Sequence, residues 1–127
     1  MPTNFPAVTG QVVTADFANQ LVAYSVTTET GSYTIDNDDL YQVFIQLSAA
    51  GTKTVTIPPD STLTAAVVGS AVTFCNTGAG LATFSAGAGV TITSAGAVSA
   101  APTLATHKVC QAVRVAANTY RIFGAIA

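Results

Sequence analysis

Apolar and hydroxyl side chains alternate in the stretch Lys53-Thr54-Val55-Thr56-Ile57-Pro58-Pro59, and two prolines end the alternation. Successive side chains on a β-strand point to opposite faces, so Val55 and Ile57 can face a core while the threonines face outward. A proline cannot donate a hydrogen bond to a neighbouring strand, so the strand has to stop before Pro58. The stretch therefore predicts a short strand that is buried on one face and ends in a turn.

The same two-residue alternation recurs along the chain between glycine, proline and asparagine turn signals. We expect roughly eight to ten short strands and no helix. The fold class is then an all-β, single-domain β-sandwich or barrel, jelly-roll-like. The clearest predicted strands are Tyr41–Leu47, Lys53–Ile57, Val72–Asn76, Val90–Thr93, Lys108–Val115 and Tyr120–Phe123. The residues expected in the core are Val55, Ile57, Val72, Phe74, Val90, Ile92, Val109, Val113 and Ile122.

The first 19 residues differ in character from the rest of the chain. They contain two prolines and one glycine but few large apolar side chains, which is typical of an extended arm. We therefore divide the chain into an N-terminal arm at residues 1–19 and a β-sandwich domain at residues 20–127. Phe5 and Phe17 are the large apolar residues of the arm, and we expect them to anchor it on a neighbouring surface. A frayed terminus without a binding role is the alternative.

Charged residues make up only 8% of the 127 residues, and the formal net charge is −2, whereas about a quarter of an average protein is charged. The four basic residues are scattered, and nucleic-acid binding needs clustered cations, so we expect no nucleic-acid partner. No apolar run approaches the roughly 20 residues of a membrane span. Residues 1–6 also lack the features of a signal peptide. We expect no membrane partner and synthesis in the cytoplasm.

The sequence offers little material for catalysis or metal binding. We expect Cys75 and Cys110 to be reduced and buried, with a disulfide as the less favoured alternative. The single histidine, His107, has a spacing from Cys110 that would put the two side chains on opposite faces of a strand. Asp36–Asp39 lacks the glycine and glutamate of a calcium loop, and Ala86–Gly89 precedes a strand instead of a phosphate-binding helix. We expect a solvated turn and a tight turn there, no enzyme activity, and no metal or other cofactor.

Four segments together resemble a family of tailed-bacteriophage virion proteins, the small capsid decoration (cement) proteins and related tail-fibre modules. The family pattern has a strand ending in Ile-Pro-Pro, a Gly-Ala-Gly turn, a run of small residues ending in Val-Thr-Ile, and a closing aromatic hairpin. The chain departs from the pattern at the close, where the family usually carries tryptophan and this chain has Tyr120 and Phe123. The matching segments are Val55–Pro59, Gly78–Gly80, Ala86–Ile92 and Tyr120–Gly124.

The resemblance implies a structural virion protein that binds and stabilises the outside of a phage capsid, as a homotrimer, with the major capsid protein as its partner. It would be made in the host cytoplasm and reside on the capsid surface of the virion. The alternative is a tail or tail-fibre module, structural or receptor-binding, that recognises a glycan. Glycan sites combine aromatic side chains with polar neighbours. The candidate aromatic residues are Tyr24, Tyr33, Tyr41 and Tyr120.

Overall fold

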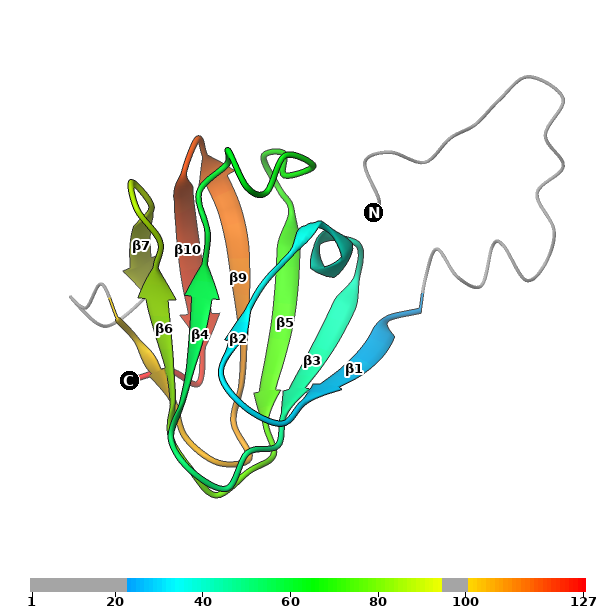
Figure 1. The fold of residues 1–127 in the computed structure, drawn as a ribbon, viewed down its shortest axis with the longest axis vertical. Coiled ribbons are helices and arrows are strands. Elements are labelled where there is room, and N and C mark those ends of the chain that lie inside the picture. Colours follow the sequence, from blue (N-terminus) through cyan, green and yellow to red (C-terminus); the bar gives the residue numbers. More distant parts are fainter. Residues whose placement is uncertain (1–22, 95–100) are drawn as a thin grey trace, which may run out of the picture.

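The computed structural model describes residues 23–94 and 101–127, so the N-terminal arm with Phe5 and Phe17 lies outside the described residues. Within this part the chain forms ten strands and one short 3-10 helix, and it contains no α-helix (Figure 1). The prediction of an all-β chain built from short strands is confirmed. The elements are β1 (Ser25–Glu29), β2 (Tyr33–Thr34), η1 (Asn37–Leu40), β3 (Val43–Leu47), β4 (Lys53–Ile57), β5 (Ala71–Asn76), β6 (Ala82–Ala86), β7 (Thr91–Ser94), β8 (Thr103–Leu104), β9 (Val109–Ala116) and β10 (Thr119–Gly124).

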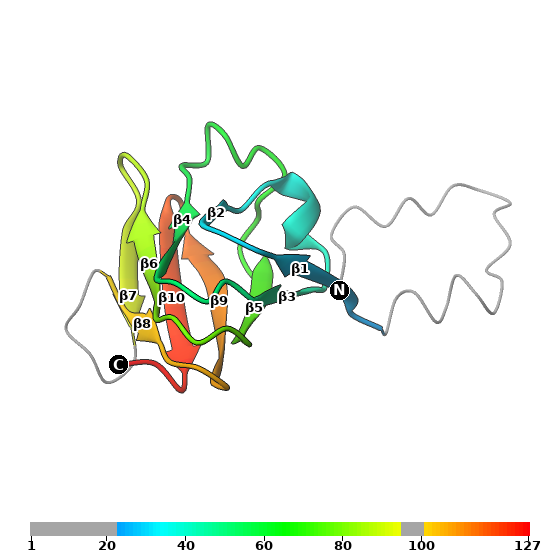
Figure 2. The ribbon, with the colours of Figure 1, turned by 60° about the horizontal axis from the view of Figure 1, so that its bottom comes forward.

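The strands form two sheets, which Figures 1 and 2 show as two layers. Sheet A has six strands in the order β1-β3-β5-β9-β10-β7, and sheet B has four in the order β2-β4-β6-β8. From β1 to β8 the chain changes sheet after every strand. As a result β1, β3 and β5 are mutually parallel in sheet A, and β2, β4 and β6 are parallel in sheet B. The first six strands therefore wind as stacked coils of two strands each.

The two-sheet sandwich agrees with the predicted fold class, but the connectivity differs from that of a jelly roll. Jelly rolls are antiparallel, whereas the stacked coils here pair in parallel. Antiparallel pairing appears where β9 joins β5 and β10, and where β8 joins β6. The predicted strands Lys108–Val115 and Tyr120–Phe123 correspond to β9 and β10, which pair as an antiparallel hairpin, and Asn118 takes the left-handed φ of 47° in the turn between them.

The core lies between the two sheets, and most of the predicted core residues are buried there. The rings of Phe74 on β5 and Phe84 on β6 meet edge to face across the sandwich, with centroids 5.0 Å apart. Val90 packs against the core while only partly buried. The predicted core residues that are buried are Val55, Ile57, Val72, Phe74, Ile92 and Ile122.

The side of β9 that faces the core is the opposite of the side that was predicted. Val109 was expected to point inward, yet 43% of its surface is exposed. Val113 is only half-buried, and the buried residues of the strand are Cys110 and Ala112. Cys110 lies beside Phe74, and Ala112 lies beside both Val72 and Ile122. Small inward side chains on this central strand leave room for the large side chains around them. They are needed because a protein interior is close-packed and has no space for more large groups there.

Two predicted irregular segments are more ordered than expected. Asp36–Asp39 was expected to be a solvated turn, but Asn37–Leu40 forms the helix η1 and the side chain of Asp39 is buried. Asp36 accepts a hydrogen bond from the backbone N–H of Asp38, and Asp39 accepts one from the N–H of Asp36. The segment between the predicted strands Val90–Thr93 and Lys108–Val115 contains the short strand β8, while residues 95–100 lie outside the described residues.

Two turns of successive coils stack in direct backbone contact at one end of the sandwich. A Cβ placed on Gly78 would lie 2.0 Å from the carbonyl oxygen of Ala49, and one on Gly80 would lie 2.0 Å from that of Gly51. Asn76, which is fully buried, donates to the carbonyl oxygens of Gly80 and Leu104, both at 2.8 Å. Its own Oδ1 accepts from the N–H of Gly78 at 3.2 Å. We call the stacked turns at residues 49–51 and 78–80 the turn stack. Asn76 connects it to strand β8 through the carbonyl oxygen of Leu104.

Replacing Ile57 with alanine is expected to lower the free energy of unfolding by about 2 to 4 kcal/mol, because the side chain is fully buried between the sheets. The matched change Val109→Ala is expected to cost less than about 1 kcal/mol, since the outward side chain loses little burial. Urea titration of both variants measures the difference. Equal losses would contradict the orientation of β9.

Candidate functional site

The ionisable side chains of the described residues mostly hold the fold together. The hydroxyl of Tyr33 on β2 donates to Oδ2 of Asp39, which links sheet B to helix η1. Burial raises the pKa of Asp39, although the hydrogen bonds that it accepts act in the opposite direction. Burial, followed by the neighbouring Asp39, also raises the pKa of Tyr33, which therefore stays protonated. The pair is a structural contact between a donor and a buried acceptor.

An ion pair closes the end of the sandwich that lies opposite the turn stack. Arg114 on β9 donates to both carboxylate oxygens of Asp60, from Nη2 at 2.7 Å and from Nε at 3.2 Å. Asp60 also accepts from the N–H of Asn118, while the N–H of Asp60 donates to Oδ1 of Asn118 at 2.7 Å. The β4–β5 connection is thus locked to the β9–β10 hairpin. The Arg114 guanidinium lowers the pKa of the Asp60 carboxyl.

Because of this contact, the free energy of unfolding depends on pH. Because the carboxyl of Asp60 has a lower pKa when folded than when unfolded, its contribution is complete above the unfolded pKa of about 4 and disappears as the pH falls through the folded pKa. At pH 7 the variant Asp60→Asn is expected to be about 1.5 to 3 kcal/mol less stable than the wild type. Denaturation at a series of pH values measures the difference in stability between the variant and the wild type, which is expected to disappear at acidic pH. Arg121→Gln, which removes an exposed cation, is the control.

The two cysteines lie on neighbouring strands of sheet A, and the single histidine lies just before one of these strands. Cys75 and Cys110 are both free thiols, as predicted, but only Cys110 is buried, whereas Cys75 is half-buried. Cys110 is paired with Phe74, so Cys75 points to the other face of sheet A. Burial raises the pKa of the Cys110 thiol to about 12, which keeps it protonated and unreactive. His107 is exposed and lies before β9, with a left-handed φ of 65°.

Lys53 is buried, in contrast to the exposed position usual for a lysine. Its Nζ donates to the carbonyl oxygen of Ala49 at 2.6 Å, inside the turn stack. Burial lowers the pKa of this amine. The side chain holds the turn that leads into β4, so we interpret it as a structural residue.

The face of sheet A that points away from the core is neutral and partly apolar. We call it the outer face; in the described strands Arg121 is the one charged residue on it. The outward side of β3 contributes Phe44, which is half-buried next to Val26 and Tyr24. One row that crosses the sheet from β1 to β10 consists of Val26, Phe44, Thr73, Gln111 and Phe123.

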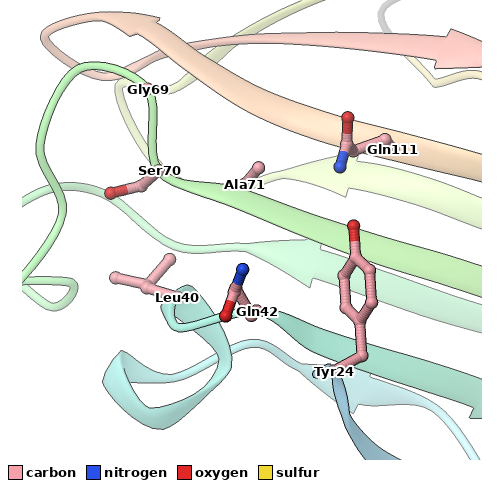
Figure 3. A pocket seen from close by; sticks show the side chains of 7 residues that line it. All are labelled: Tyr24, Leu40, Gln42, Gly69, Ser70, Ala71 and Gln111. Carbon is pink, nitrogen blue, oxygen red and sulfur yellow. The ribbon is translucent and has the colours of Figure 1, made fainter. Parts of the chain in front are cut away.

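A small pocket of about 150 Å³ opens beside this row (Figure 3). Figure 3 shows the hydroxyl of Tyr24 and the amide of Gln111 pointing toward one another across it, with the amide of Gln42 next to Leu40. None of the described residues that line it is charged. The full lining is Tyr24, Leu40, Gln42, Gly69, Ser70, Ala71 and Gln111.

Of the four tyrosines proposed for glycan contact, Tyr24 alone lines this pocket. Tyr120 is fully buried in the core, and Tyr33 is held by Asp39. Tyr24 has 51% of its surface exposed, and its ring meets that of Phe44 edge to face. Sequence reasoning missed Gln42, Ser70 and Gln111 because no local pattern indicates that a helix end, a loop and a distant strand converge.

Gln42 has two unusual properties. Its backbone has a φ of 54°, a left-handed conformation that an ordinary side chain adopts at a cost of about 1 to 2 kcal/mol. Its Oε1 is buried, and no described residue donates a hydrogen bond to it. Strain and unsatisfied polar atoms of this kind concentrate at binding sites. Together they mark the pocket as the candidate functional site.

Comparisons with known proteins identify no relative. No family model, curated protein or solved structure matches the chain. Within residues 23–94 and 101–127, no group of three or more histidine, cysteine, aspartate or glutamate residues is placed to hold a metal ion. In the same residues no helix has the length and apolar character needed to cross a membrane.

Proposed function

We propose that this protein is a structural virion protein that decorates and stabilises the outside of a phage capsid. One observation supports the proposal beyond the resemblance of the sequence: the ionisable groups of the described residues whose pKa values are shifted serve the fold. Asp39, Lys53, Asp60 and Arg114 each hold two elements or a turn together, and the thiol of Cys110 is buried. Perturbed groups of an enzyme usually converge in a cleft. Here they are dispersed through a scaffold.

Stabilisation of a capsid by such a protein is thermodynamic. A protein that binds the assembled shell more tightly than free subunits shifts the equilibrium toward the intact shell. The N-terminal arm would supply attachment to the major capsid protein through Phe5 and Phe17, and the sandwich would supply the folded body. An extended arm covers a large area with few residues when it orders on binding.

The proposed assembly is a homotrimer on the capsid surface. The order of the oligomer follows from the family resemblance, while the low charge content favours a closed assembly in which less polar surfaces are shared. Light scattering at micromolar protein concentration measures the mass. A mass equal to that of one 12.8 kDa chain would contradict the trimer.

Deletion of residues 1–14 is expected to leave the melting temperature of the protein nearly unchanged but to abolish its binding to particles that lack the endogenous protein. The reason is that the described core is built from residues 35–122, while the proposed anchor Phe5 is removed with the deleted segment. Mass spectrometry of purified particles measures the occupancy. Unchanged occupancy after deletion would assign attachment to the sandwich.

Point variants separate the anchors from the rest of the arm. Phe5→Ala and Phe17→Ala are each expected to weaken particle binding, since burying a phenylalanine contributes about 1.5 to 3 kcal/mol. Gln11→Ala, a polar change within the same arm, is the control.

Decoration also predicts a copy number that follows the number of capsid subunits, whereas a tail structure would contain far fewer copies.

A receptor-binding module of a tail or tail fibre is the second candidate function. The pocket that contains Tyr24 favours it, because the pocket combines an exposed aromatic ring with neutral hydrogen-bonding groups. Copy number on purified particles distinguishes the two candidates.

A further inference from the structure

We propose that the pocket on sheet A binds a single pyranose ring of a neutral glycan. The polar residues of the site are Tyr24, Gln42, Ser70 and Gln111, and the apolar side chains of Leu40 and Ala71 complete it. These residues come from the start of β1, the end of η1, the β4–β5 connection and β9, so the fold brings together side chains that are distant in sequence (Figure 3). The proposal holds for a protein on a capsid and for one in a tail.

The size of the pocket selects a small ligand. Its volume is about 150 Å³, and a cavity of about that volume accommodates a six-membered benzene ring. Pockets for drug-sized molecules are larger, at about 300 to 1,000 Å³. One six-membered ring therefore fills the pocket, while substituents of that ring extend through its open side.

The chemistry of the lining selects a neutral, hydroxylated ring. The described lining residues carry no charge, so a phosphate, carboxylate or ammonium group would lose its hydration without gaining a partner of opposite charge. Amides and hydroxyls can both donate and accept hydrogen bonds, which matches the hydroxyls of a sugar. The Oγ of Ser70 accepts from the N–H of Val67 at 3.0 Å and points away from Tyr24 and Gln111 in Figure 3, so Tyr24, Gln42 and Gln111 supply the hydrogen-bonding groups.

The conformation of Gln42 is unfavourable for the stability of the folded protein, which is typical of a residue that binds a ligand. Its left-handed backbone and the buried, unpaired Oε1 are both unfavourable. Rotation of the amide about its terminal bond exchanges the oxygen and the nitrogen, so the group can present either an acceptor or a donor to a sugar hydroxyl. A sugar hydroxyl in the pocket can therefore pair with whichever amide atom of Gln42 faces it.

A shallow apolar hollow adjoins the pocket and extends the site. Tyr24 and Gln111 line both spaces, and the hollow continues over Val109 and Phe123. Phe123 has 41% of its surface exposed, and such a ring can contact the apolar face of a second sugar. We therefore expect a disaccharide to bind more tightly than its isolated monosaccharide.

Saturation-transfer NMR tests the assignment with the intact protein and a panel of neutral methyl pyranosides and their disaccharides. Glucuronic acid and adenosine serve as a charged and a planar comparison. We expect at least one neutral pyranoside to bind, its disaccharide to bind more tightly, and neither comparison ligand to bind. Failure of every neutral sugar to bind, or binding of the comparison ligands in their place, would overturn the assignment.

Point variants test whether the sugar binds in this pocket. Gln42→Gly is expected to weaken sugar binding about tenfold, which corresponds to the loss of one hydrogen bond. Its melting temperature is expected to stay near that of the wild type, because glycine adopts a positive φ without strain. Tyr24→Ala and Phe123→Ala are expected to weaken binding as well. Gln46→Ala, on the outer face of β3 and outside the pocket lining, is the matched control. Equal affinity in Gln42→Gly, Tyr24→Ala and the wild type would overturn the proposed site.

Discussion

Gly80→Ala is expected to lower the free energy of unfolding by about 3 to 5 kcal/mol, among the largest effects of a single methyl group. The added Cβ would lie 2.0 Å from the oxygen and 2.1 Å from the carbon of the Gly51 carbonyl. Both atoms belong to the backbone of the neighbouring coil, so no side-chain rotation relieves the overlap and the turns have to separate. Urea titration followed by circular dichroism measures the loss.

Gly51→Ala provides the matched control, because a Cβ on Gly51 meets no atom within 4 Å. It lies in the partner turn of the same stack and is expected to change stability by less than about 0.5 kcal/mol. Gly78→Ala, with a Cβ 2.0 Å from the Ala49 oxygen, is expected to behave like Gly80→Ala. Comparable stability of the Gly80 and Gly51 variants would show that the two turns do not stack as described.

Asn76→Ala is expected to cost about 3 to 5 kcal/mol, because it removes three hydrogen bonds in a fully buried position. The carbonyl oxygens of Gly80 and Leu104 and the N–H of Gly78 would all lose a partner. A buried polar group without a partner costs about 1 to 3 kcal/mol, which makes the loss larger than that of an apolar side chain of similar size. Thermal and chemical denaturation measure it.

Asn76→Asp separates hydrogen bonding from packing. Aspartate has nearly the same shape as asparagine, but an ionised carboxylate cannot donate to the two carbonyl oxygens. The variant is therefore expected to be at least as unstable as Asn76→Ala at pH 7. Gln46→Ala, on the outer face of β3, is expected to change stability by less than about 1 kcal/mol. An aspartate variant as stable as the wild type would contradict the role of the amide as a double donor.

The sequence by itself determined the local structure of this protein. Alternation in Lys53–Ile57 predicted a strand with the bounds that the structure has, and Pro58 ended it because proline cannot continue a ladder. Alternation likewise predicted the inward faces of β5 and β7, and Asn118 lies in the turn between the last two predicted strands. These features depend on side-chain periodicity and backbone preference, which are properties of a few neighbouring residues.

Tertiary structure decided how the strands pair and which side of β9 is buried. Periodicity shows that a strand has two faces but does not say which one meets the core, and in β9 the small residues Cys110 and Ala112 face inward beside Phe74. The parallel winding, the close contact at Gly80 and the pocket around Gln42 likewise depend on residues far apart in the chain. Their positions result from filling a common core at high density, a condition that no single segment of the sequence contains.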